Sequence, residues 1–294
     1  METKELLKKV RKIEIKTRGL SRNIFAGEYH SAFKGRGMSF SEVREYQYGD
    51  DIRNIDWNVT ARFNHPYIKI FEEERELTVM LLIDVSSSRV FGTSGQLKKN
   101  LITEVAAVLS FSAIQNNDKI GVILFSDKVE KFISPQKGRT HILRIIRELI
   151  EFTPERKSTD ISEALRYLTN AIKKRATAFV ISDFIDIEEG KTKMNFHEAL
   201  KIANNKHDVI GLQVFDKREM ELPPLGMIKM KDAESDEIIW VDSSSRQVRM
   251  AYSAWWKETN KLIKEAFSQA GVDYTTLKTG EDYVKPLVTL FKRR

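Results

Sequence analysis

Nearly unbroken apolar segments that end in an acidic residue constrain the fold of this chain more than any other feature. The clearest are LTVMLLID at residues 77–84 and ATAFVISD at residues 176–183. Residues 119–126 and 207–215 are similarly apolar, but they do not end in an acidic residue. A strand that is apolar on both faces is typical of a parallel sheet covered by helices on each side. The sequence therefore predicts an α/β protein.

Segments with helical periodicity lie between these strands. They cover residues 96–115, 140–152, 161–174 and 196–205, followed by a long helix at 247–270 and a final one at 283–291. Strands that alternate with helices favour right-handed βαβ units. We therefore expect a three-layer, doubly wound, mostly parallel sheet of the Rossmann-like type.

Two other segments lie outside this alternation. We expect residues 1–75 to form an N-terminal region with a helix followed by a β-rich extension, and residues 76–294 to form the α/β domain. Within that domain, MIKMKD and EIIWVD flank a short polar turn, which predicts a β-hairpin inserted at about residues 217–245. The N-terminal helix, residues 4–16, carries apolar residues on one face and lysines on the other. We expect it to pack on its own domain, with a membrane surface as the alternative.

The composition excludes several classes of function. The chain has no cysteine, which excludes a thiol nucleophile, a disulfide framework and thiolate metal sites. Its 49 Lys and Arg residues outnumber 42 Asp and Glu residues only slightly, and the two signs alternate along the chain, so nucleic-acid binding is not expected. The apolar segments are too short to cross a bilayer, and the N-terminus lacks the apolar core of a signal peptide. We therefore expect a cytoplasmic protein.

Oxygen-bearing side chains gather at the predicted strand ends. Asp84, Ser86 and Ser88 follow the first core strand, Asp183 ends a later one, and Thr159 precedes a helix. Ligands bind at the carboxyl ends of strands in such sheets. Carboxylates and hydroxyls suit Mg²⁺, with Mn²⁺ also possible. An open coordination position would accept a partner's carboxylate, which predicts a metal-bridged protein contact and no reaction. The alternative is that these residues only cap helices and bind backbone amides.

The arrangement Asp84-x-Ser86-x-Ser88 with Thr159 and Asp183 resembles the metal-ion-dependent adhesion site of von Willebrand factor type A domains. The resemblance implies that Ser86 and Ser88 bind the ion directly, and Thr159 directly or through water. Asp84 and Asp183 would act directly or from outside the ligand shell.

One residue departs from the adhesive members of that family. Phe184 follows Asp183 where those members commonly have glycine. This difference argues against adhesion to an extracellular matrix and leaves metal binding possible.

The N-terminal region resembles a second, more specific pattern. The strings are GEYHS at 27–31, GRGMSF at 35–40, REYQYGDDIRNIDW at 44–57, TARF at 60–63 and ISDFID at 181–186. Together they resemble the domain-of-unknown-function 58 family, over almost the whole chain. The resemblance implies a bacterial or archaeal protein with a von Willebrand-like domain, encoded beside a MoxR-type AAA+ ATPase. Such proteins are thought to act with those ATPases as adaptors in assembling, activating or metal-loading other proteins.

Five residues of this pattern have two possible roles. We expect structural roles for them, and a partner-binding surface is the alternative. They are Arg44, Arg53, Asp56, Trp57 and Arg62.

These observations predict a non-enzymatic, Mg²⁺-dependent interaction protein. It would present its metal site to an acidic residue on a MoxR-type ATPase or on a client of that ATPase. No Walker A string, zinc-spaced histidines or G-x-S-x-G motif points to catalysis. Two alternatives remain: a basic surface module that binds nucleic acid or anionic membrane without metal, and a metal-dependent hydrolase that uses the same acids.

Overall fold

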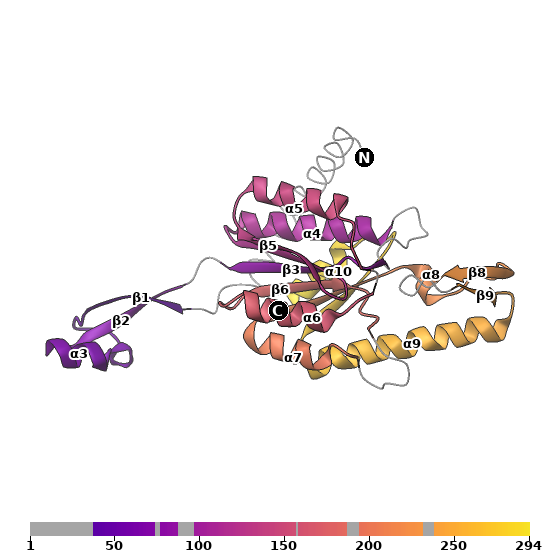
Figure 1. Ribbon diagram of the computed structural model, residues 1–294. Helices are drawn as coiled ribbons and strands as arrows, with labels where there is room; N and C mark the ends of the chain where they lie inside the picture. Colours follow the sequence, from indigo (N-terminus) through magenta and orange to yellow (C-terminus); the bar gives the residue numbers. More distant parts are fainter. Residues whose placement is uncertain (1–37, 74–76, 88–96, 157, 187–193, 232–237) are drawn as a thin grey trace. The chain divides into compact units, whose positions relative to one another are not determined.

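The computed structural model describes most of the chain (Figure 1). The described residues are 38–73, 77–87, 97–156, 158–186, 194–231 and 238–294. The predicted N-terminal helix and Ser88 lie outside them. The described chain divides into two compact units. The smaller unit lies within residues 33–77, and the larger unit begins at Thr78.

The larger unit is built on a mixed six-stranded sheet with the order β10-β7-β6-β3-β4-β5. Neighbouring strands are parallel except at one edge, where β5 runs antiparallel to β4. The strands are β3 (Thr78–Asp84), β4 (Lys119–Phe125), β5 (Val129–Gln136), β6 (Thr177–Ser182), β7 (Asp208–Phe215) and β10 (Asp273–Lys278). The prediction of an α/β fold with a mostly parallel sheet is confirmed.

Helices cover both faces of this sheet (Figure 1). Helices α4 and α5 lie on one face, and α6, α7 and α9 lie on the other. Helix α10 packs beside β10. The helices are α4 (Lys98–Gln115), α5 (Arg139–Glu151), α6 (Ile161–Ala171), α7 (His197–Lys206), α9 (Arg246–Gln269) and α10 (Val284–Lys292). Among the described residues, no helix is both long and apolar enough to cross a membrane.

Burial on both faces explains the apolar strand sequences. Every residue of β6 is buried, and only the first residue of β3 is partly exposed. Burying each large aliphatic side chain stabilises the fold by roughly 1.5–3 kcal/mol. On β7, a Cβ atom at Gly211 would lie 2.5 Å from the ring of Phe267. Glycine at this position therefore allows α9 to pack directly against the sheet.

A β-hairpin is inserted between β7 and α9, where the sequence predicts one. Strands β8 (Met227–Lys231) and β9 (Ile238–Asp242) are antiparallel, and the short helix α8 (Lys217–Met220) precedes them. Several apolar side chains of the hairpin are exposed, and Trp240 is 67% exposed. The hairpin therefore adds little to the core of the larger unit.

The smaller unit is an antiparallel strand pair with a short helix. It contains β1 (Met38–Glu45), the 3-10 helix η2 (Ile52–Asn54), α3 (Trp57–Phe63) and β2 (Tyr67–Glu73). Among its residues with described side chains, Ile68 is the one buried hydrophobic residue. A two-stranded hairpin is marginally stable alone, so local polar contacts matter here.

Two residues of the N-terminal pattern provide such contacts. Arg44 makes a bidentate ion pair with Asp50, at 2.7 and 2.8 Å, and this lowers the pKa of Asp50. Asp56 caps α3 by accepting hydrogen bonds from the backbone N–H groups of Asn58 and Val59. Structural roles for Arg44 and Asp56 thus have a physical basis.

The other three residues of that set contribute less to this unit. Trp57 is 70% exposed, Arg62 is exposed, and the Arg53 side chain is 90% exposed and lies 3.9 Å from Asp51. An exposed ion pair of this kind stabilises a protein little. Among the described residues of this unit, no strong contact of Arg53, Trp57 or Arg62 supports the structural role predicted for them.

Histidine 207, at the junction of α7 and β7, makes the fold sensitive to acid. Its ring is fully buried, its Nδ1 accepts a hydrogen bond from the Ala176 N–H, and its Nε2 has no partner. Burial, together with smaller effects of the positive charges of Lys206 and Arg175, lowers the pKa of His207 to about 4. In the unfolded chain, the side chain of His207 would bind a proton with a pKa near 6.5. His207 is therefore neutral in the fold at neutral pH.

We predict that the contribution of His207 to the free energy of unfolding is constant above about pH 6.5 and falls as the pH drops towards 4, because this residue then binds more protons in the unfolded state. At pH 4 the loss assigned to His207 is about 3 kcal/mol. Urea unfolding at a series of pH values measures it. The His207→Gln variant should flatten this dependence, whereas His65→Gln, at an exposed histidine, should keep the wild-type slope. Equal slopes in all three proteins would contradict the prediction.

Candidate functional site

The candidate site lies where the order of the strands in the sheet reverses. From β3 the chain proceeds to β4 on one side and later returns to β6 on the other. Asp84 is the last residue of β3, and Asp183 directly follows β6. Because β3 and β6 are parallel neighbours, both acids lie together at the carboxyl ends of the strands, and these ends form one edge of the sheet. This edge, at the reversal of strand order, is where ligands bind in open α/β sheets.

Asp84 is buried and held by donors on both carboxylate oxygens. The Ser86 N–H donates to its Oδ1 at 2.9 Å, and the Ser182 hydroxyl donates to its Oδ2 at 2.7 Å. Burial, with a smaller effect of the negative charge of Asp183, outweighs these hydrogen bonds and raises the pKa of Asp84 to about 6. The fold therefore places two carboxyl groups close enough for their charges to interact.

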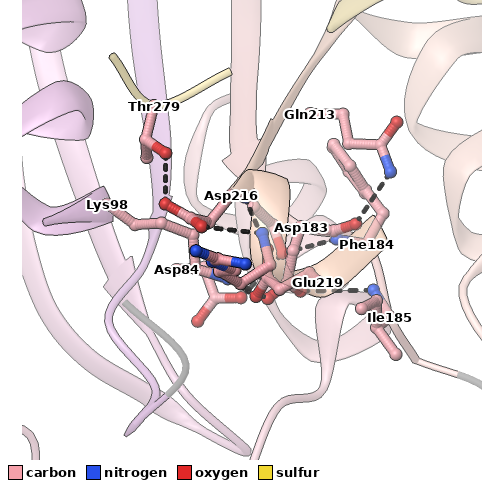
Figure 2. Close-up of polar contacts among 11 residues, drawn as sticks. Asp84, Lys98, Asp183, Phe184, Ile185, Gln213, Asp216, Glu219 and Thr279 are labelled. Atoms are coloured by element: carbon pink, nitrogen blue, oxygen red, sulfur yellow. Dashed lines mark hydrogen bonds and ion pairs between the residues drawn. The ribbon is translucent and has the colours of Figure 1, made fainter. Parts of the chain in front are cut away.

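A buried lysine, which sequence analysis did not identify, neutralises part of this charge. Lys98 is the first residue of α4, and its Nζ lies 2.9 Å from Asp183 Oδ2 and 2.6 Å from Glu219 Oε1 (Figure 2). Its side chain is only 2% exposed. Burial alone would lower the pKa of Lys98, but the charges of Asp183 and Glu219 outweigh burial and raise the pKa above its ordinary value. Lys98 is therefore a charged ammonium.

Glu219 brings the inserted segment to the site. It lies on α8, and its Oε2 accepts a hydrogen bond from the Asp216 N–H at 2.7 Å. Asp216 in turn caps α8 and accepts a hydrogen bond from the hydroxyl of Thr279, after β10 (Figure 2). Burial raises the pKa of Glu219, although Lys98 opposes this. The ends of several strands are thus joined to the site through one polar network.

The segment that contains Thr159 reaches the same edge of the sheet. The N–H of Asp160 donates to the Ser126 carbonyl, directly after β4, at 2.9 Å. The N–H of Ile161 donates to Asp186, beyond β6, at 3.3 Å. Thr159, which is half-buried, thus precedes two residues that connect to the strands on either side of β3.

Phe184 occupies a backbone conformation that favours glycine. Its φ is 60°, in the left-handed region, which costs roughly 1–2 kcal/mol for a residue with a Cβ atom. Its N–H donates to the Ser182 hydroxyl at 3.0 Å, and its ring packs against Phe267 with centroids 4.9 Å apart. Burial of the aromatic ring therefore offsets the strained backbone. This explains how phenylalanine replaces the glycine of the adhesive pattern.

The structure thus brings Asp84, Ser86 and Asp183 together, and it places Thr159 at the same edge. Ser88 lies outside the described residues. Within the part of the chain that the structure describes, no three His, Asp or Glu side chains form a group able to hold a metal. An ion at this site would therefore depend on hydroxyl ligands as well as carboxylates.

No sequence signal separates Lys98 from its neighbour Lys99. Both lie in the first turn of the same helix, α4, yet Lys99 donates to the Ile150 carbonyl on α5 at 2.6 Å. Glu219 belongs to an insertion whose position relative to the strand ends depends on tertiary structure.

Similar proteins are known from several bacteria. The chain is 28% identical to an uncharacterized protein of Mycobacterium tuberculosis, Rv1480, over 290 residues, which are 97% of this chain and 88% of that protein. It is 33% identical to the uncharacterized protein YeaD of Bacillus subtilis over 110 residues, 37% of this chain and 25% of that one.

A solved structure and a family model complete the comparison. The crystal structure of an aerotolerance-related membrane protein from Bacteroides fragilis has a similar fold, with a TM-score of 0.51 and 15% identity, over 74% of this chain and 100% of that one. The model of the family described as "Protein of unknown function DUF58" matches residues 42–261. The match covers most of the chain, so this protein belongs to the DUF58 family.

Proposed function

We propose that this protein is a non-enzymatic interaction protein that binds a partner in a divalent-cation-dependent manner. Its contact surface would be the sheet edge that carries Asp84, Ser86 and Asp183. The observation that supports this proposal is an excess of buried negative charge at that edge.

The charge balance of the described residues favours a further cation. Two acids, Asp183 and Glu219, contact one ammonium, Lys98, and a third acid, Asp84, lies close enough to Asp183 for their charges to interact. These four groups carry two net negative charges when all three acids are ionised. Burying carboxylates without compensating charge is costly. The raised pKa of Asp84 reflects that cost. A cation with two positive charges would balance the site.

The oxygen donors suit Mg²⁺, and Mn²⁺ has similar requirements. Asp84, Ser86 and Asp183 would hold the ion, and the resemblance to von Willebrand factor type A domains adds Ser88 and Thr159. When bound, the ion would supply a positive charge with one position open to a carboxylate of the partner. The chain's own groups keep these ligands in place: the Ile185 N–H donates to Asp183 Oδ1 at 3.2 Å.

The same contacts argue against catalysis by these residues. Both oxygens of Asp84 accept hydrogen bonds, so neither is presented as a nucleophile. Lys98 is held as an ammonium between two carboxylates, so it is not a free base. Residues placed in this way can bind and orient a ligand, but they do not form a pair of nucleophile and general base.

For the partner, we propose a MoxR-type AAA+ ATPase or a client of that ATPase, recognised through an acidic side chain. Family membership and the chemistry of the site support this choice. We place this activity in the cytoplasm, where such ATPases would be available. The protein would act as an adaptor in the assembly or activation of other proteins.

A first prediction concerns the purified protein. Mg²⁺ should raise the melting temperature of the wild type, because a ligand present at about 100 times its Kd stabilises a fold by about 2.7 kcal/mol. Asp84→Asn keeps the size of the side chain and removes its charge. Because its amide NH2 cannot accept one of the two hydrogen bonds that Asp84 accepts, its melting temperature in EDTA serves as its own reference, and Mg²⁺ should not raise that temperature. A Mg²⁺ response equal to that of the wild type would exclude Asp84 as a ligand.

A second prediction concerns partner capture from a native lysate. The wild type should retain a MoxR-type ATPase or its client in Mg²⁺ and lose it in EDTA. Asp84→Ala should lose the same partner in Mg²⁺, whereas Glu265→Ala, at an exposed acid on α9, should retain it. Quantitative mass spectrometry measures the recovered proteins. Recovery of the same proteins under all conditions would refute the metal-bridged contact, and binding that weakens with salt but not with EDTA would favour a basic surface instead.

A further inference from the structure

We propose that the Lys98 ammonium competes with the divalent cation for Asp183, so that this site has a lysine-bound state and an ion-bound state. The inference rests on the proposed function, because it concerns the regulation of the same site. In the lysine-bound state, the site would not engage a partner.

The position of Lys98 is the first argument. Its Nζ lies 2.9 Å from Asp183 Oδ2, an oxygen that belongs to the proposed ligand set. Its side chain is 2% exposed, so solvent does not screen its charge. Two cations in contact with one carboxylate repel each other strongly in a buried environment. The ammonium therefore weakens the binding of a divalent ion at Asp183 for as long as it stays in contact with this carboxylate.

The second argument is that Lys98 has a place to which it can withdraw. Its other partner, Glu219, lies 2.6 Å away and is held by the N–H of Asp216. Lys98 can therefore release Asp183 and keep one carboxylate partner. Without Glu219, the displaced ammonium would be buried and unpaired, which is much more costly.

The third argument concerns the start of α4. Lys98 is the first residue of that helix, where the helix dipole disfavours a positive charge. Leu97, at the N-cap, provides no side-chain cap. The ammonium is therefore retained at this position by Asp183 and Glu219 and not by the helix. A retained cation of this kind can be displaced by a stronger one.

Mn²⁺ binding to four purified proteins tests this inference, with free Mn²⁺ followed by electron paramagnetic resonance. The proteins are the wild type, Lys98→Met, Lys98→Arg and Lys99→Met. Lys98→Met should bind Mn²⁺ at least about tenfold more tightly than the wild type, because the competing charge is gone. Lys98→Arg keeps the charge and should bind no more tightly than the wild type. Lys99→Met removes the adjacent lysine, which contacts α5 instead of the site, and should match the wild type.

The outcomes separate the two proposals. If the wild type binds Mn²⁺ and Lys98→Met binds it no more tightly, the competition is refuted and the proposed metal site stands. If neither protein binds Mn²⁺, both proposals are refuted. If Lys98→Met does not fold in EDTA, the double variant Lys98→Met/Glu219→Gln, with one acid fewer, is compared with Glu219→Gln. The double variant should bind Mn²⁺ at least about tenfold more tightly, and equal affinities would again refute the competition.

Discussion

The parallel pairing of β3 with β6 is the constraint on which the rest of the site depends. It aligns Ile83 with Ile181, so the next residues, Asp84 and Ser182, lie side by side at the strand ends. Both strands are buried on both faces, and a slip of the register would remove many apolar contacts together. The hydrophobic core therefore fixes the positions of the acids with a precision that loops alone would not provide.

The cost of that arrangement is electrostatic. Two carboxyl groups at neighbouring strand ends cannot both be ionised and buried without compensation, and the elevated pKa of Asp84 records this conflict. The fold resolves part of it with Lys98, which comes from the next helix, and with backbone and hydroxyl donors. Replacing a charged network by apolar residues is often neutral or stabilising. Stability alone therefore does not require a charged network at this position.

The residues of the DUF58 pattern divide into two physical groups. Arg44, Asp50 and Asp56 fix the backbone of the smaller unit through an ion pair and a helix cap. Trp57 and Arg53 are largely exposed there and contribute little to it. An exposed tryptophan in a specific sequence pattern is a candidate for contact with another surface, as aromatic residues often dominate such contacts. The partner-binding alternative for Trp57 and Arg53 thus stays a prediction.

How much the sequence reveals depends on the range of the interaction. Periodicity and apolar runs are local properties, so they were sufficient to predict the α/β alternation, the inserted hairpin and the strand ends at Asp84 and Asp183. The sequence pattern also distinguished Phe184 as a departure, but only the structure explains it, through a left-handed backbone and a ring buried against Phe267.

Lys98 and Glu219 could not be assigned to the site from sequence. They are 121 residues apart, and their contact requires α4 and α8 to meet at the same sheet edge. The sequence by itself determined which strands are buried and which oxygen-bearing side chains follow them, because those are properties of single segments. Only the tertiary structure decided which cation accompanies the acids, because charge pairing depends on distance in space and not on position along the chain.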